Sequence, residues 1–111
     1  MQVIFVHGNF RQGCKDHQMV AGEVCLGRAE TAEQYALCIM DSKPLVTKRP
    51  VSTIKGEVYE VSDETLRSLD RREGYPHSTK RERVPIRLAD NRMVDAWLYF
   101  SCAAPARFDT R

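Results

Sequence analysis

Residues 56–76 have the sequence GEVYEVSDETLRSLDRREGYP, and this stretch decides the fold. Its first part belongs to a run with β-branched and aromatic side chains, and the pattern predicts a strand over residues 53–61. Ser62 or Asp63 then supplies the side-chain oxygen that caps a helix N-terminus. The helix is predicted to run to about Arg72, because the glycine and the proline that follow it end helices.

The rest of the chain contains further strand patterns. Short apolar or alternating runs predict strands at residues 3–6, 22–28, 34–40, 83–88 and 93–100. Strands and helices do not alternate regularly, so a parallel sheet is not expected. The pattern therefore predicts an α+β fold built on a small, mostly antiparallel β-barrel of about six strands, with one or two flanking helices.

Three other segments have weaker patterns. Residues 11–20 are predicted to contain a short helix. Residues 42–51 are predicted to form a loop, because two prolines interrupt them. From residue 103 onward the pattern fades, so we expect one domain over residues 1–102 and a mobile tail over residues 103–111.

The composition argues against several classes of protein. The chain has 111 residues and a formal net charge of +2, too little to argue for a nucleic-acid or membrane-surface partner. No apolar run is long enough to cross a bilayer, and no signal-peptide pattern is visible. The four cysteines are widely spaced and favour reduced thiols, and Cys14 and His17 lack the second ligand pair of a zinc site. We expect a cytoplasmic protein and favour a monomer.

The most informative residue of the predicted helix is Glu73. Leu66 and Leu69 mark the apolar stripe, and at about 100° per residue Glu73 falls between them in angle. A carboxylate that faces the core needs partners or loses its charge, and burial raises its pKa from about 4.3 towards neutrality. Such a shift suits a general acid/base. The alternative is that the helix frays and the Glu73 side chain turns to water or pairs with an arginine.

A second candidate site is the loop at residues 7–11, with the sequence HGNFR, directly after the first strand. Its glycine allows a sharp turn and the close approach of a ligand, and such a loop can present several N–H groups to an anion or a carbonyl group. Glycine after a strand is more often only a turn. His7 is a candidate second acid/base or hydrogen-bond donor, or simply a packed histidine. Tyr99 carries a hydroxyl that needs a partner if it is buried, although an aromatic residue there is most often core.

Together these features resemble the γ-glutamylcyclotransferase-like family. In that family an opening strand runs into a Tyr-Gly-(Ser/Thr)-Leu-Arg loop, a central segment resembles GEVYEV-x-DETL-x-x-LD-x-x-EGYP, and a strand with the pattern AW-x-Y follows. The matching segments here are residues 6–13, 56–61, 63–76 and 96–100. Order and spacing hold over about residues 2–100, and the central segment is the most specific part.

The resemblance implies an enzyme with a small β-barrel over residues 1–102. The implied reaction, an amide cleavage of the transferase or lyase type, is attack by the α-amine of a γ-glutamyl group on its own γ-carbonyl. It releases 5-oxoproline and a free amine or amino acid. The implied partner is a γ-glutamyl small molecule, with no metal or cofactor, and Glu73 is the implied catalytic acid/base. In line with the composition, no nucleic-acid or membrane partner is expected. The implied substrate-binding residues are His7, Gly8, Asn9, Phe10, Arg11 and Tyr99.

Three loop positions depart from the family pattern. The tyrosine of that pattern is His7 here, its serine or threonine is Asn9, and its leucine is Phe10. A retained acid beside an altered loop leaves open a non-catalytic module that binds a small ligand or a protein on the same fold. RNA binding through the basic run at residues 80–87 is a third interpretation, although no aromatic stacking pattern accompanies that run.

Overall fold

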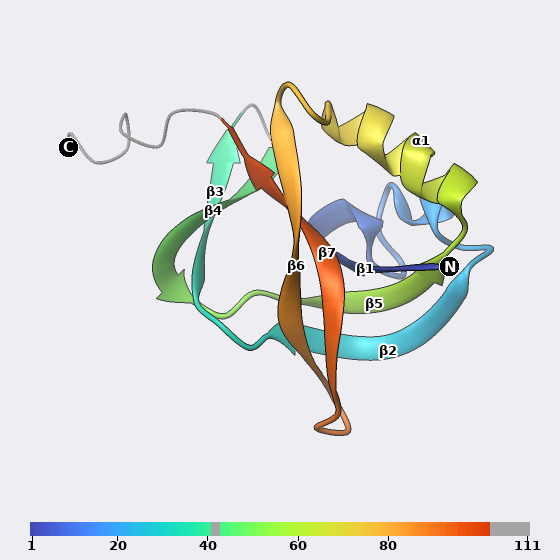
Figure 1. The fold of residues 1–111 in the computed structure, drawn as a ribbon, viewed down its shortest axis with the longest axis horizontal. Coiled ribbons are helices and arrows are strands. Elements are labelled where there is room, and N and C mark those ends of the chain that lie inside the picture. Colours follow the sequence, from blue (N-terminus) through green and yellow to red (C-terminus); the bar gives the residue numbers. More distant parts are fainter. Residues whose placement is uncertain (41–42, 103–111) are drawn as a thin grey trace.

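The computed structural model describes residues 1–40 and 43–102 (Figure 1). The strands within these ranges are β1 (Gln2–Val6), β2 (Val24–Thr31), β3 (Tyr35–Met40), β4 (Lys43–Ser52), β5 (Lys55–Val61), β6 (Thr79–Leu88) and β7 (Met93–Ser101). The helices are the 3₁₀ turns η1 (Gly8–Phe10) and η2 (His17–Met19) and the α-helix α1 (Asp63–Glu73). The tail predicted at residues 103–111 lies outside the described residues. None of the described helices is long and apolar enough to span a membrane.

Five strands form a closed barrel in the order β1-β5-β2-β6-β7. Four of the five neighbouring strand pairs in the barrel are antiparallel. The fifth pair closes the barrel, and there β1 pairs in parallel with β7 through Ile4 and Trp97. Strands β3 and β4 form a separate antiparallel ribbon beside the barrel (Figure 1). The structure thus confirms the predicted α+β fold with a small, mostly antiparallel barrel.

The prediction of a loop over residues 42–51 is wrong from residue 43 onward, because the chain forms strand β4 there. Both prolines of the segment lie within this strand, and Pro44 is paired with Ile39 of β3. A two-stranded ribbon leaves each strand with an edge, and proline is tolerated at an edge because its missing N–H interrupts no ladder there. Pairing with β3 therefore makes this segment a strand, although its two prolines favour a loop. The helix predicted within residues 11–20 is reduced to the single turn η2.

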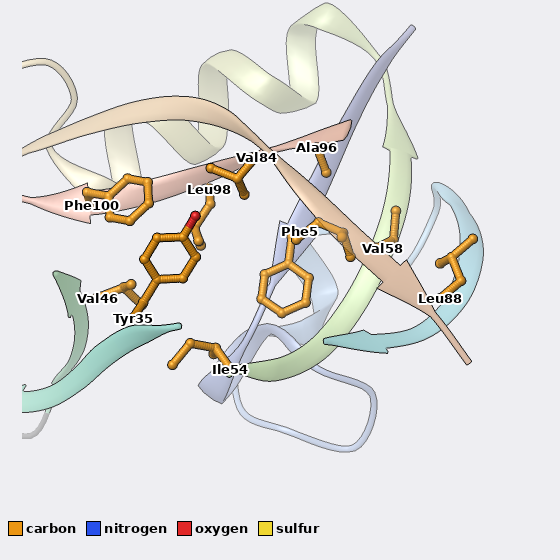
Figure 2. Packing of buried hydrophobic residues seen from close by; sticks show 11 residues of the cluster. Phe5, Tyr35, Val46, Ile54, Val58, Val84, Leu88, Ala96, Leu98 and Phe100 are labelled. Carbon is orange, nitrogen blue, oxygen red and sulfur yellow. The ribbon is translucent and has the colours of Figure 1, made fainter. Parts of the chain in front are cut away.

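Strand β1 divides the hydrophobic core into two parts. Phe5 points into the barrel and packs with buried side chains of the other strands (Figure 2). Ile4 and Val6 face the opposite way and pack in the cluster that contains Leu66 and Leu69 of α1. Successive side chains of a strand point to opposite faces, and here both faces are covered. The two-sided burial explains why residues 3–6 of β1 are an uninterrupted apolar run.

Local capping determines both ends of α1. The Oγ of Ser62 accepts a hydrogen bond of 3.1 Å from the N–H of Thr65, and Gly74 forms the C-cap. The predicted helix is therefore confirmed, with Glu73 as its last residue. Glu73 thus occupies a defined helical position on an element that is capped at both ends.

Candidate active site

A cavity of about 260 Å³ lies where the C-terminal end of α1 meets β1, η1, β7 and the start of β4. Apolar side chains of the two core clusters form part of its wall, a composition typical of small-molecule sites. The polar and charged residues of the wall are His7, Asn9, Lys15, Asp16, Lys43, Arg72, Glu73 and Tyr99.

Helical periodicity places Glu73 in this wall. Leu66 and Leu69 are 6% and 1% exposed, so their face of α1 is the buried one. Burial raises the pKa of Glu73 above its ordinary value, against the opposing effect of the nearby cations Lys43 and Arg72. No group in the described part of the chain donates a hydrogen bond to this carboxylate. Its oxygens are therefore available to a ligand.

The loop after β1 forms another side of the cavity. Gly8 has a φ of +62°, and a Cβ added to it would lie 2.9 Å from Cγ of Pro44. Glycine alone meets both conditions without strain or displacement of its neighbour. The N–H groups of Gly8 and Asn9 precede the hydrogen bonds of η1 and donate to no other described residue. They are therefore available to an oxygen atom of a ligand.

His7 contributes a neutral imidazole to the cavity wall. Burial, assisted by the charge of Arg11, lowers the pKa of His7 to about 4. At neutral pH the ring therefore carries one N–H and one lone pair. Its Nδ1 atom is buried and has no hydrogen-bond partner within the described ranges. Because buried polar atoms are normally paired, this nitrogen is a candidate ligand contact.

Tyr99 reaches the cavity from β7, and its hydroxyl donates a hydrogen bond of 2.6 Å to Oδ1 of Asp70. Arg81 binds the same carboxylate through hydrogen bonds of 2.9 and 3.1 Å. Sequence reasoning assigned no chemistry to Asp70, although a signal exists. Asp70 follows Leu66 by four residues and precedes Glu73 by three, so helical spacing places both carboxylates on one face.

The structure brings most of the predicted site residues together. Those that line the cavity are His7, Asn9, Phe10, Glu73 and Tyr99. Gly8 forms the turn between the first two of them. Arg11 does not line this cavity, because its Nε donates a 3.1 Å hydrogen bond to the carbonyl of Gly8 and its side chain lines a separate groove.

Other wall residues could not be identified from sequence. Lys43 and Pro44 come from β4, the segment predicted to be a loop, and Lys15 and Asp16 come from the segment before η2. Asp16 forms a 2.7 Å ion pair with Arg72, which connects this segment to α1. These positions depend on contacts between distant parts of the chain. Among the residues that the structure describes, no cluster of three or more histidine, cysteine, aspartate or glutamate side chains could hold a metal ion.

Known proteins are similar to this chain in sequence. The family model described as gamma-glutamyl cyclotransferase, AIG2-like, matches residues 4–110. A Methanocaldococcus jannaschii protein with the name "Putative gamma-glutamylcyclotransferase" is 36% identical over 101 residues, which span 90% of this chain and 84% of that protein. The gamma-glutamylaminecyclotransferase of Rattus norvegicus is 29% identical over 99 residues, which span 81% of this chain and 66% of that protein.

The fold is also similar to that of a solved structure. The crystal structure of an AIG2-like protein from Mus musculus matches with a TM-score of 0.87 and 27% identity, over 96% of this chain and 81% of that chain. The family-model match covers most of the chain, including every segment that forms the cavity. The resemblance noted in the sequence is thereby confirmed, and the chain belongs to the gamma-glutamyl cyclotransferase, AIG2-like family.

Proposed function

We propose that this protein is an enzyme that cyclises a small γ-glutamyl amine or γ-glutamyl amino acid and releases 5-oxoproline. Membership of the family and the names of the relatives support this reaction class. The observation that carries the proposal is the state of Glu73. Its carboxylate lies in the wall of a cavity of suitable size, with a raised pKa and with no hydrogen bond from the described residues.

The proposed reaction is an intramolecular substitution. The α-nitrogen of the γ-glutamyl group forms a bond to the γ-carbon, and the bond between the γ-carbon and the departing nitrogen breaks. Glu73 takes one proton from the attacking nitrogen and delivers it to the departing nitrogen, so neither water nor a co-reactant is consumed. A cavity that holds the substrate folded, with its two reacting groups in contact, supplies much of the rate acceleration.

The raised pKa of Glu73 suits both halves of this proton transfer. A carboxylate of ordinary pKa is a weak base for an amine proton, and burial strengthens it. The same shift lets the protonated acid persist long enough to supply the departing nitrogen. The charges of Lys43 and Arg72 lower the pKa of Glu73 and so oppose the larger effect of burial.

The loop after β1 completes the proposed site. The N–H groups of Gly8 and Asn9 bind the glutamyl moiety, including the oxygen on which negative charge develops. His7, with a pKa of about 4, acts as a neutral hydrogen-bonding group rather than as a base. Phe10 supplies apolar wall. A substrate contact by the Arg11 guanidinium stays a prediction.

The test measures 5-oxoproline release from a panel of γ-glutamyl amines and γ-glutamyl amino acids. We expect the wild type to convert at least one member and Glu73→Gln to fold but lose about 10²- to 10⁴-fold in kcat. Glu64→Gln is the matched control, because Glu64 lies exposed in the first turn of the same helix and its loss should leave kcat unchanged. Equal turnover by the wild type and Glu73→Gln would reject the role of Glu73.

Two other outcomes distinguish the alternatives. Binding of a panel member without conversion, with an affinity insensitive to Glu73→Gln, would indicate the non-catalytic module. RNA affinity that falls steeply with added salt would indicate binding through the basic run at residues 80–87. Within that run Arg81 is already engaged, because it binds Asp70 and lies against two aromatic rings.

A further inference from the structure

A chain of hydrogen bonds that the proposed proton transfer does not use begins in the cavity wall at Tyr99. Tyr99 donates its hydroxyl proton to Oδ1 of Asp70 at 2.6 Å. Arg81 donates from Nε to the same oxygen at 2.9 Å and from Nη2 to Oδ2 at 3.1 Å. The side chains of Arg81 and Asp70 are each 15% exposed. Three mostly buried side chains from α1, β6 and β7 thus hold one another.

Aromatic rings keep Arg81 in place. Its guanidinium carbon lies 4.6 Å from the centre of the Tyr75 ring and 4.4 Å from the centre of the Trp97 ring. Trp97 is held in turn by a 3.0 Å hydrogen bond from its Nε1 to Oε1 of Gln2. A planar guanidinium that contacts two rings and forks onto a carboxylate has little freedom. The orientation of the Asp70 carboxylate is therefore well determined.

This arrangement decides where the hydroxyl proton of Tyr99 points. In this bond the carboxyl oxygen of Asp70 is the acceptor and the phenol is the donor. Its proton is committed to Asp70, and the Tyr99 oxygen therefore offers only lone pairs to a ligand. Burial and the bond to Asp70 raise the pKa of Tyr99, so the hydroxyl keeps its proton at neutral pH. Tyr99 is thus unsuited to stabilising an oxyanion, which requires a donor.

A neutral primary amine has two N–H groups and one lone pair. We propose that Asp70 is a positioning residue that fixes the Tyr99 oxygen as an acceptor for one N–H of the attacking α-amine, while Glu73 accepts the other. With both N–H groups held, the lone pair is directed at the γ-carbonyl. This inference rests on the proposed function. Glu73 and Tyr99 both line the cavity, as two groups that share one amine require.

The experiment is a double-mutant cycle on 5-oxoproline release, with a panel substrate that the wild type converts. The variants are Tyr99→Phe, Asp70→Asn and the two combined. Tyr99→Phe removes only the acceptor oxygen. Asp70→Asn leaves one acceptor oxygen in place of two, so Arg81 and Tyr99 compete for it. Asp90→Asn is the matched control, because Asp90 forms an exposed ion pair with Arg92 between β6 and β7.

We expect Tyr99→Phe and Asp70→Asn each to lower kcat about tenfold and to change KM by less than about threefold. The combined variant should be no slower than Tyr99→Phe, because Asp70 acts through that hydroxyl. Losses in kcat that add in the combined variant would overturn the inference. So would an Asp70→Asn protein with a lower melting temperature and an unchanged kcat, since that result assigns Asp70 a structural role.

Folding of Asp70→Asn is checked by near-UV circular dichroism and thermal unfolding. If it does not fold, Arg81→Lys is compared with and without Tyr99→Phe, because lysine keeps the charge but cannot fork onto a carboxylate. The variant that combines Arg81→Lys with Tyr99→Phe should again be no slower in kcat than Tyr99→Phe alone. A wild type that converts no panel member defeats the proposed function. An active wild type with an unaffected Tyr99→Phe variant defeats only this inference.

Discussion

Replacing Gly8 with alanine should damage the fold and the cavity together. The φ of Gly8 is +62°, and a Cβ in that backbone region costs about 1 to 2 kcal/mol. The added Cβ would also lie 2.9 Å from Cγ of Pro44, so the loop or strand β4 must shift. Overpacking of this kind typically costs about 1 to 3 kcal/mol. Pro44 lines the cavity, as do both neighbours of Gly8, so the shift changes the shape of the site.

Two other glycines separate these contributions. Gly13 has a φ of +79° and nothing within 4 Å of an added Cβ, so Gly13→Ala isolates the backbone cost. Gly22 has neither a positive φ nor a contact, so Gly22→Ala should be neutral or stabilise by about 0.4 to 1 kcal/mol through the unfolded chain. We expect Gly8→Ala to be more destabilising than Gly13→Ala by about 1 kcal/mol or more.

The assays are urea unfolding, followed by the fluorescence of the single tryptophan, and 5-oxoproline release by the folded variants. Of the three alanine variants, only Gly8→Ala should lower kcat/KM. Adding Pro44→Ala removes the atom in contact and should recover that part of the stability loss. A Gly8→Ala protein no less stable than Gly13→Ala, with nothing recovered by Pro44→Ala, would refute the reasoning about this contact.

Side chains of the site and of the core give three further predictions. Because the pKa of Glu73 is raised, the native state binds more protons than the unfolded chain between the ordinary and the raised pKa, so stability falls as pH rises through that window. Glu73→Gln should remove this pH-dependent fall in the free energy of unfolding, as measured by urea titrations at acid and neutral pH. An unchanged dependence on pH in Glu73→Gln would contradict the prediction. The pKa of His7 is lowered to about 4, so stability is lost as pH falls from about 6.5 to about 4, by up to about 3 kcal/mol. His7→Gln should flatten that part of the profile, and persistence of the full slope would exclude His7 as its source. Leu69 is 1% exposed, so Leu69→Ala should cost about 2 to 5 kcal/mol in thermal unfolding, against less than about 0.5 kcal/mol for Arg67→Ala on the exposed face.

Helix α1 could be predicted because its signals are local. Ser62 and Gly74 lie at its two ends, and the spacing of Leu66 and Leu69 identifies its buried face. The two caps bond to residues a few positions away, and the leucine spacing lies within the same short stretch, so the helix and its buried face can be predicted from local sequence. The same spacing placed Glu73 on the buried face, and the cavity lies there.

Strand β4 and the strand order of the barrel could not be predicted, because their causes are not local. The prolines at positions 44 and 50 favour a loop when they are considered alone, and only the pairing with β3 makes that segment a strand. The barrel closes where β1 meets β7, at the pair Ile4 and Trp97. A pattern within either strand cannot indicate this partner, because apolar alternation shows that a face is buried but not which strand lies beside it.

The site combines a local feature with partners that only the folded chain supplies. Asp70 and Glu73 share one face of α1 through helical spacing alone, yet their surroundings make them different. Asp70 receives three hydrogen bonds, from Tyr99 and Arg81, and is committed to the fold. Glu73 receives none from the described residues, and Lys43 reaches it only by charge. Barrel closure brings β7 beside β1, and strands β6 and β7 supply the partners that bind Asp70 and leave Glu73 without a hydrogen bond from the described residues, as the roles proposed for the two carboxylates require.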